Sequence, residues 1–383
     1  MNFLPRALCV FLLAASAASA QRISDPNLDD YVPTVEDELV IYVPKNAVRV
    51  GFRALSGASA GFSGQGVISS KSVLGSDSGV QERIYHDGAV GLDQRKVADP
   101  SGVLVPITPD GYTNNWTFAE QSQAEAEPGF IAMHAYTATI TDTALRNKDP
   151  GTALGIEVST EREMGSLFNS RLKWGLVGGV SVNQILSEMK ANVTADVETI
   201  TDFYSLDGQA APTAPYTAPT ATLGVDNSVL LRSQLLQRLR STAASEVAVE
   251  NRWKLRGAYL TLRAGPTLLL PITSRFSASV SVGGVLVYAG TSFEVEQSFT
   301  PETGDTLVES VASNDYALLP GYYVDANLQY DFTDNAGLYL GAIYQSSGSY
   351  DHQVSSSDEL SNYKARVDLA SLQGIRAGMT FKF

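Results

Sequence analysis

Hydrophobic and polar residues alternate with a period of two along most of the chain. In the stretch 322–332 the even positions are Tyr, Val, Ala, Leu, Tyr and Phe, whereas the odd positions are Tyr, Asp, Asn, Gln and Asp. The stretch 258–268 alternates in the same way, and a similar stretch follows the tight link at 271–273. Successive side chains of a β-strand point to opposite faces, so this pattern predicts antiparallel strands with one apolar face.

The alternation predicts about ten strands, an even number, as single-chain bacterial barrels have. The strands at 130–140 and 192–204 have the least regular alternation, and losing 192–204 and one other strand gives eight, the alternative count. The expected strands are 47–63, 130–140, 153–163, 170–184, 192–204, 253–270, 274–290, 317–332, 336–350 and 364–383.

Two architectures produce such strands. A soluble sandwich buries its apolar faces, whereas a transmembrane barrel turns them outward to lipid. Strands of ten or more residues, aromatic residues at strand ends and connections of alternating length favour the barrel. We therefore expect an all-β fold: a transmembrane antiparallel up-and-down β-barrel over 47–383. Its long extracellular loops would be 64–129, 205–252, 291–316 and 351–363, with the first of them either an outer loop or a plug.

The chain begins with a predicted signal peptide at 1–20. Arg6 precedes a short apolar run, and Ala18-Ser19-Ala20 supplies a small-residue cleavage site after Ala20. Residues 21–46 are interpreted as a periplasmic lead-in. The only cysteine, Cys9, lies in the signal peptide, so the mature chain has no disulfide.

The net charge and the hydropathy of the chain argue against a nucleic-acid-binding protein and against a helical membrane protein. The formal net charge is −14, which argues against nucleic acid as a partner because phosphate binding requires clustered Lys and Arg. No stretch after the signal peptide reaches the roughly 18 consecutive apolar residues of a transmembrane helix. If the chain spans a membrane, it does so with strands.

The last strand resembles the C-terminal signal of bacterial outer-membrane β-barrel proteins, which end in an aromatic residue after alternating apolar positions. The matching residues are Ile375, Met379, Phe381 and Phe383. The resemblance implies a Gram-negative outer membrane, recognition by the barrel assembly machinery, and closure of the last strand on the first. The segment "NNWTFAEQSQ" at 114–123 is also similar to a set of outer-membrane barrels of comparable length whose activity is unknown.

The inward faces of the predicted barrel carry charges of both signs. A barrel of eight to ten strands is filled by its own side chains, and buried charges require partners, so we expect a lumenal salt-bridge network that plugs the barrel. The alternative is a water-filled interior with solvated, ion-selecting charges. The predicted lumenal charges are Arg49, Arg53, Glu157, Glu161, Lys173, Arg263, Asp325, Asp331 and Arg376.

Candidate catalytic and metal-binding groups are few. The three histidines are His86, His134 and His352, and neither His86-Asp87 nor Asp351-His352 forms a dyad, because neighbours on a strand point to opposite sides. No acidic turn has the spacing of a calcium-binding loop. We expect no catalytic residue, metal or cofactor.

The sequence therefore favours a non-enzymatic outer-membrane β-barrel that acts as a membrane anchor and surface-interaction protein through its extracellular loops. Its partners would be outer-membrane lipid, the assembly machinery and an extracellular ligand that the sequence does not identify. A narrow porin-like channel for small solutes is the alternative, and a barrel hydrolase is third.

Overall fold

The computed structural model describes residues 45–168, 171–219 and 228–383. The described residues belong to one compact unit, Lys45–Phe383. The predicted signal peptide and all but the last two residues of the predicted lead-in (21–46) lie outside the described residues.

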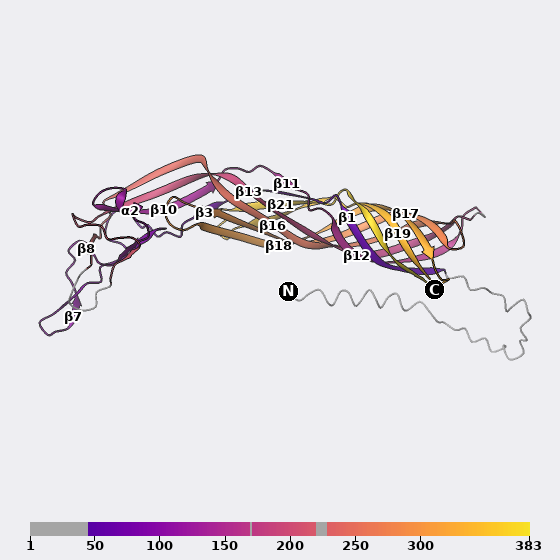
Figure 1. Ribbon diagram of the computed structural model, residues 1–383, viewed down its shortest axis with the longest axis horizontal. Helices are drawn as coiled ribbons and strands as arrows, with labels where there is room; N and C mark the ends of the chain where they lie inside the picture. Colours follow the sequence, from indigo (N-terminus) through magenta and orange to yellow (C-terminus); the bar gives the residue numbers. More distant parts are fainter. Residues whose placement is uncertain (1–44, 169–170, 220–227) are drawn as a thin grey trace, which may run out of the picture. The chain divides into compact units, whose positions relative to one another are not determined.

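Eight antiparallel strands are hydrogen-bonded into a ring (Figure 1). Around the ring they are β1 (Asn46–Ser56), β22 (Leu372–Lys382), β19 (Ala336–Ser346), β18 (Leu307–Asp331), β17 (Phe276–Phe299), β16 (Gln237–Pro271), β13 (Lys173–Ser205) and β12 (Ala153–Ser166). The order returns to its start because β1 pairs with both β22 and β12: Val50 lies opposite Met379 on one side and Val158 on the other. The last strand thus lies beside the first.

The ring contains the alternative number of strands, eight rather than ten. The predicted strands 170–184 and 192–204 are two parts of the continuous strand β13. The predicted strand 130–140 exists as β10 (Phe130–Ile140), but it pairs with residues Ala195–Ser205 of β13, outside the ring. The sequence prediction divided β13 because the apolar positions change from even to odd within it.

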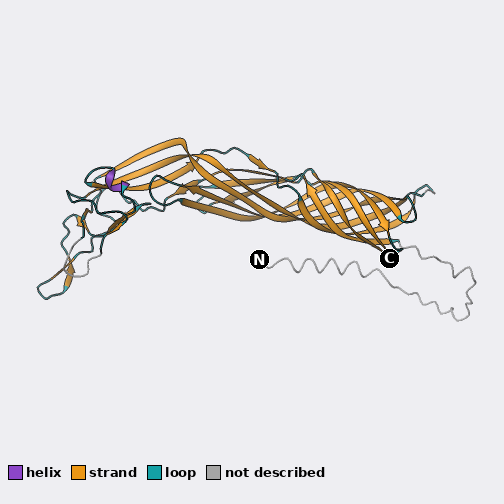
Figure 2. Cartoon of the chain, in the orientation of Figure 1, coloured by secondary structure: helices purple, strands orange, loops and turns teal. Residues whose placement is uncertain are grey.

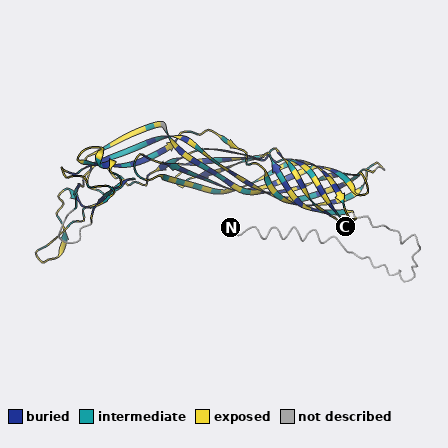
Figure 3. Ribbon diagram, in the orientation of Figure 1, coloured by how far each residue is buried: buried dark blue, intermediate teal, exposed yellow. Residues whose placement is uncertain are grey.

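Along the strands of the ring, buried and exposed side chains alternate (Figure 3). The buried, inward face carries most of the polar residues and the exposed, outward face is apolar. β1, β19 and β22 are each 11 residues long, the length with which a tilted strand crosses a bilayer. Aromatic residues lie near both ends of the exposed face, with Phe276 against Tyr330 at one end and Tyr288 against Tyr316 at the other. We call this exposed face the apolar band; it includes Val50, Phe52, Leu154, Ile156, Val158, Leu176, Val180, Val182, Leu262, Leu268, Val280, Val282, Val324, Leu328, Leu338, Leu340, Ile375 and Met379.

Four strands continue past the apolar band, and there the two faces exchange character. β13, β16, β17 and β18 have 33, 35, 24 and 25 residues, far longer than an ordinary strand. On β13 the outward face changes from Val180 and Val182 to Glu188 and Lys190, while Val193 becomes buried on the inward face. The strand keeps its period of two, and only the environment of each face changes.

The extended parts of these four strands pack against a second sheet. That sheet has the order β11 (Arg146–Lys148), β2 (Ser59–Gln65), β21 (Asn362–Asp368) and β20 (Ser349–Ser355). Phe62 of β2 is fully buried, with ring centroids 6.1 Å from Trp253 and 5.9 Å from Phe293. We call these two packed sheets the distal sandwich.

A smaller body of short strands, the cap, is built largely from the predicted loop 64–129. Its core includes Trp116, which stacks on Phe118 at 5.8 Å and packs against Tyr216. Its elements are β3 (Val67–Ser69), β4 (Arg83–Ile84), β5 (Gly88–Val90), β6 (Lys96–Ala98), β7 (Leu104–Pro106), β8 (Tyr112–Thr113), β9 (Trp116–Phe118), α2 (Ser122–Glu125), β10, β14 (Tyr216–Thr217) and β15 (Leu231–Arg232).

Three of the predicted loops therefore need correction. The segment 205–252 includes β14, β15 and the first part of β16, 291–316 is strand except for the turn at 300–306, and 351–363 includes most of β20 and the start of β21. The polar residues of these segments suggested loops, but many of them lie on the exposed side of strands. The described residues contain one short helix, α2 (Figure 2), and no helix among them is long and apolar enough to cross a membrane.

Candidate functional site

The inside of the ring holds a buried network of charged side chains. Glu157 lies at its centre: Nη1 of Arg376 is 2.9 Å and Nη2 of Arg263 is 3.3 Å from its Oε1. Asp325 is the second shared carboxylate, 2.5 Å from Arg263 and 3.0 Å from Arg376. Because all four side chains are at most 4% exposed, these contacts replace hydration.

The remaining predicted lumenal charges are at the edges of this network. Arg49 pairs with Glu161 at 2.5 Å, whereas Nη1 of Arg53 is 3.9 Å from Oε2 of Glu157. We call these seven residues the lumenal network: Arg49, Arg53, Glu157, Glu161, Arg263, Asp325 and Arg376. The predicted residues Lys173 and Asp331 lie outside it, half-buried at the rim, where they pair with Glu163 and Lys382.

Sequence reasoning missed the neutral residues that complete the lumen. The amide oxygen of Asn327 accepts two hydrogen bonds from Arg376, at 2.9 and 2.7 Å. Gln345 and Ser181 accept hydrogen bonds from Arg53. The signal for Asn327 and Ser181 was parity, because each lies an even number of positions from a charged residue of its own strand, Asp325 and Lys173. Gln345 had no such signal, since β19 carries no charged residue.

Buried apolar side chains close the lumen toward the distal sandwich. Leu55, Ile185, Val287, Ile343 and Leu372 come from five strands of the ring, and each is at most 5% exposed. They belong to the core that also contains Phe62 and Trp253. The polar lumen is therefore bounded on this side by packed hydrocarbon.

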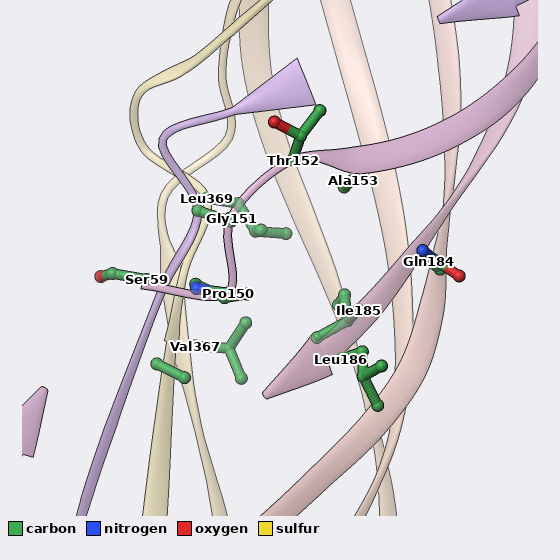
Figure 4. Close-up of a pocket in the computed structure, with 12 residues that line it drawn as sticks. Ser59, Pro150, Gly151, Thr152, Ala153, Gln184, Ile185, Leu186, Val367 and Leu369 are labelled. Atoms are coloured by element: carbon green, nitrogen blue, oxygen red, sulfur yellow. The ribbon is translucent and has the colours of Figure 1, made fainter. Parts of the chain in front are cut away.

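A small cavity without charged groups lies at the base of the distal sandwich. It has a volume of about 90 Å³ and lies between the start of β2, the segment Pro150–Ala153, β13 and the end of β21 (Figure 4). Its walls include Ala58, Ala60, Ile185, Leu186, Val367 and Leu369. A cavity of this lining lacks the convergent polar groups of a catalytic or ligand site.

Asp87 pairs with His134 and not with its sequence neighbour His86. Nδ1 of His134 lies 2.5 Å from Oδ2 of Asp87, and the His134 backbone N–H donates to Oδ1 at 2.8 Å. The hydroxyl of Thr303 donates to Asp87 at 3.0 Å, and His86 Nε2 lies 2.7 Å from the carbonyl oxygen of Asp305. In a catalytic triad the hydroxyl and the carboxylate contact opposite ring nitrogens, whereas here both are on the Nδ1 side. These contacts fasten the cap to the β17–β18 turn.

His352 is a structural residue of the distal sandwich. It is fully buried on β20, with Nδ1 3.0 Å from the hydroxyl of Thr291 and Nε2 2.9 Å from the hydroxyl of Ser313. Burial lowers the pKa of His352 below its ordinary value of 6.5, with Asp315 acting weakly in the other direction. Its ring is thus held neutral with both nitrogens occupied.

The proposed assembly signal faces outward. Ile375, Met379, Phe381 and Phe383 are all exposed on the outside of β22 or just after it. The backbone of Phe383 exchanges hydrogen bonds with Asn46, at 3.2 and 2.9 Å, so the chain's last residue is tied to the first strand. No group of three or more His, Cys, Asp or Glu side chains within the described residues is arranged to hold a metal ion.

No protein-family model matches the chain, and no curated protein matches it. Three solved structures similar to it are the outer membrane protein OprG of Pseudomonas aeruginosa, the attachment invasion locus protein Ail of Yersinia pestis in complex with the heparin analogue sucrose octasulfate, and a FadL homologue of Pseudomonas aeruginosa. OprG is 10% identical, with a TM-score of 0.29 over 89% of this chain and 96% of its own. Ail is 10% identical, with a TM-score of 0.19 over 85% and 98%, and the FadL homologue is 10% identical, with a TM-score of 0.19 over 88% and 90%. These structural neighbours are bacterial outer-membrane β-barrel proteins.

Replacing Glu157 by Gln removes the carboxylate that Arg263 and Arg376 share. Because buried charges then lose their partner, we expect the free energy of unfolding to fall by about 3–5 kcal/mol. The matched control is Glu163→Gln at the partly exposed rim, where we expect a loss of about 0–1 kcal/mol. Urea unfolding in lipid vesicles, followed by tryptophan fluorescence, measures both. Equal losses would show that the centre of the network is no more critical than its rim.

We expect the distal sandwich to lose stability on acidification. The lowered pKa means that the unfolded chain takes up the His352 proton first, so stability is full above about pH 6.5 and declines as the pH falls below it. Thermal unfolding in detergent, followed by fluorescence of Trp253, measures this between about pH 8 and pH 5. His352→Gln should flatten the profile, and an unchanged profile in the variant would assign the effect to another group.

Proposed function

We propose that the protein is an integral outer-membrane β-barrel of a Gram-negative bacterium whose plugged ring anchors a folded, non-enzymatic binding body at the cell surface. The ring would span the membrane through the apolar band, with outer-membrane lipid around it. The exposed aromatic end of β22 would be the segment that the assembly machinery recognises.

The observation that carries the proposal is the exchange of polarity on the long strands. On β16 the outward residues change from Leu262, Leu260 and Ala258 to Arg256 and Lys254 within a few positions. A strand that leaves lipid for water requires this change, because its outward face then meets water.

The same change supports an orientation. The first residue of β1, Asn46, and the last residue of the sequence, Phe383, are hydrogen-bonded on the side of the short turns, away from the distal sandwich. In barrels of this class short turns are periplasmic and long excursions extracellular. The distal sandwich and cap would therefore be extracellular.

The β6–β7 hairpin of the cap is the surface best suited to a partner (Figure 1). Val97, Val103 and Leu104 are between 43% and 58% exposed, although a two-stranded hairpin has little stability of its own in water. Its base is held by Arg95, which contacts Asp93 at 2.9 Å and Asp110 at 2.6 Å. Exposed apolar side chains on a supported hairpin favour contact with a protein surface.

The channel alternative has less support. A conducting path would have to pass both the lumenal network and the apolar residues beside Leu55 and Leu372, which are packed and dry. The hydrolase alternative has even less support. Both ring nitrogens of His352 have hydrogen-bond partners, and Asp87 and Thr303 contact the same ring nitrogen of His134, so neither histidine has the arrangement of a catalytic triad.

Planar-bilayer recordings test the anchor against the channel. We expect the mature chain, refolded in detergent and inserted, to give no stable current steps, because the lumen is filled. Circular dichroism beforehand establishes that the barrel is folded. Steps whose size changes in Arg263→Gln would establish an open charged path and overturn the plugged anchor.

A polar variant of the hairpin tests the binding body. We expect bacteria that display the chain to be retained on plates coated with immobilised protein from their surroundings, and Val97→Ser/Val103→Ser/Leu104→Ser to reduce retention about tenfold by removing apolar contact area. Val308→Ser, an exposed apolar position on the extended part of β18, is the matched control. Equal retention of the variant and the control would exclude the hairpin as the contact surface.

A further inference from the structure

The charges inside the ring do not balance. At the level of the apolar band, six basic and five acidic side chains point into the ring, which leaves a net charge of one positive unit. They are Arg49, Arg53, Lys173, Arg263, Arg376 and Lys382 with Glu157, Glu161, Glu163, Asp325 and Asp331. Three pairs at the edges of the lumen are neutral: Arg49 with Glu161, Lys173 with Glu163, and Lys382 with Asp331.

The surplus charge belongs to Arg53. Arg263 and Arg376 each lie within 3.3 Å of both central carboxylates, whereas the nearest carboxylate oxygen to Arg53 is 3.9 Å away. The two hydrogen bonds of its guanidinium go to neutral acceptors, the Ser181 hydroxyl at 2.5 Å and the Gln345 amide oxygen at 3.1 Å. Arg53 also lies directly opposite Arg376 in the β1–β22 pairing, where two like charges repel.

Unused hydrogen-bond donors surround the same place. Nε of Arg53 and the hydroxyls of Tyr259 and Thr261 are buried and have no partner. All three residues are at most 1% exposed. Thr261 pairs in register with Ser181, the residue that Arg53 contacts, and Tyr259 pairs with Asn183 on the same face of β13. The two hydroxyls therefore lie at the level of Arg53 in the ring, because Arg53 is opposite Gly155 of β12, Gly155 is opposite Asn183, and Asn183 is opposite Tyr259.

We infer that a small monovalent inorganic anion, such as a halide, occupies the lumen beside Arg53 and accepts hydrogen bonds from Tyr259 and Thr261. Water could satisfy the two hydroxyls, but it would leave a net charge buried beneath the apolar residues Leu55 and Leu372, which is costly in a region of low dielectric. An anion satisfies the donors and neutralises Arg53 at once. It is a structural counterion and does not depend on the surface-binding role.

Crystals of the refolded mature chain grown in sodium bromide test this inference, since bromide scatters anomalously. We expect one lumenal bromide peak beside Arg53 in the wild type. Gln345→Glu places a carboxylate on the Arg53 guanidinium, so it should abolish the peak by supplying the counter-charge from the protein. The matched control, Gln345→Met, removes the same amide without adding charge and should keep the peak.

The melting temperature gives a second measurement that does not require crystals. At constant ionic strength we expect the wild type and Gln345→Met to melt several degrees higher in bromide than in the bulky anion gluconate, and Gln345→Glu to melt equally in both. A wild-type lumen without bromide, a peak that persists in Gln345→Glu, or melting temperatures that do not respond to the anion would overturn the inference.

Discussion

The structure depends on one constraint: a β-strand alternates its side chains between two faces wherever it goes. A strand whose surroundings change along its length must therefore exchange the polar and apolar character of its faces while it keeps its hydrogen-bonded neighbours. β13 does this between Val182 and Val193 without a break, and β16, β17 and β18 do the same beside it. The same backbone pairings between β13, β16, β17 and β18 therefore continue from the ring into the distal sandwich.

This continuity explains the two interiors of the molecule. Along the apolar band, the inward face holds Glu157, Asp325 and their arginines, which are buried and pair with one another. Beyond the band, where the outward face is polar, the inward face holds Phe62, Trp253 and neighbouring apolar side chains. The ring therefore has a polar interior that borders the apolar core of the distal sandwich.

The cap shows how polar contacts join bodies that grow from different parts of the chain. Thr303 in the β17–β18 turn bonds to Asp87, which also holds His134, while the backbone N–H of Gly304 donates to Glu120 at 2.8 Å. Buried carboxylates with several donors define one arrangement more narrowly than apolar contact does. These contacts hold the cap in one position on the β17–β18 turn, and the β6–β7 hairpin is part of that cap.

The period of two determined the fold class, the side of each strand that faces outward, and the lumenal charges. Each of these follows from position along a strand, so Arg49, Arg53, Glu157, Glu161, Arg263, Asp325 and Arg376 could be assigned inward by parity alone. The same logic failed at residues 184–192, where the apolar positions changed parity and one strand was divided into two.

Odd or even position along a strand does not say which side chains of different strands meet, and the tertiary structure decided this. Which cation meets which carboxylate depends on how the strands are staggered around the ring, and so the sequence did not show that Lys173 and Asp331 lie at the rim and pair with Glu163 and Lys382. The pairing of Asp87 with His134 instead of His86 depends on the folding of the 64–129 segment, whose short strands carry little periodic signal. The sequence specifies the faces of each strand because that rule is local, whereas partners between distant strands arise only when the ring closes and the sheets pack.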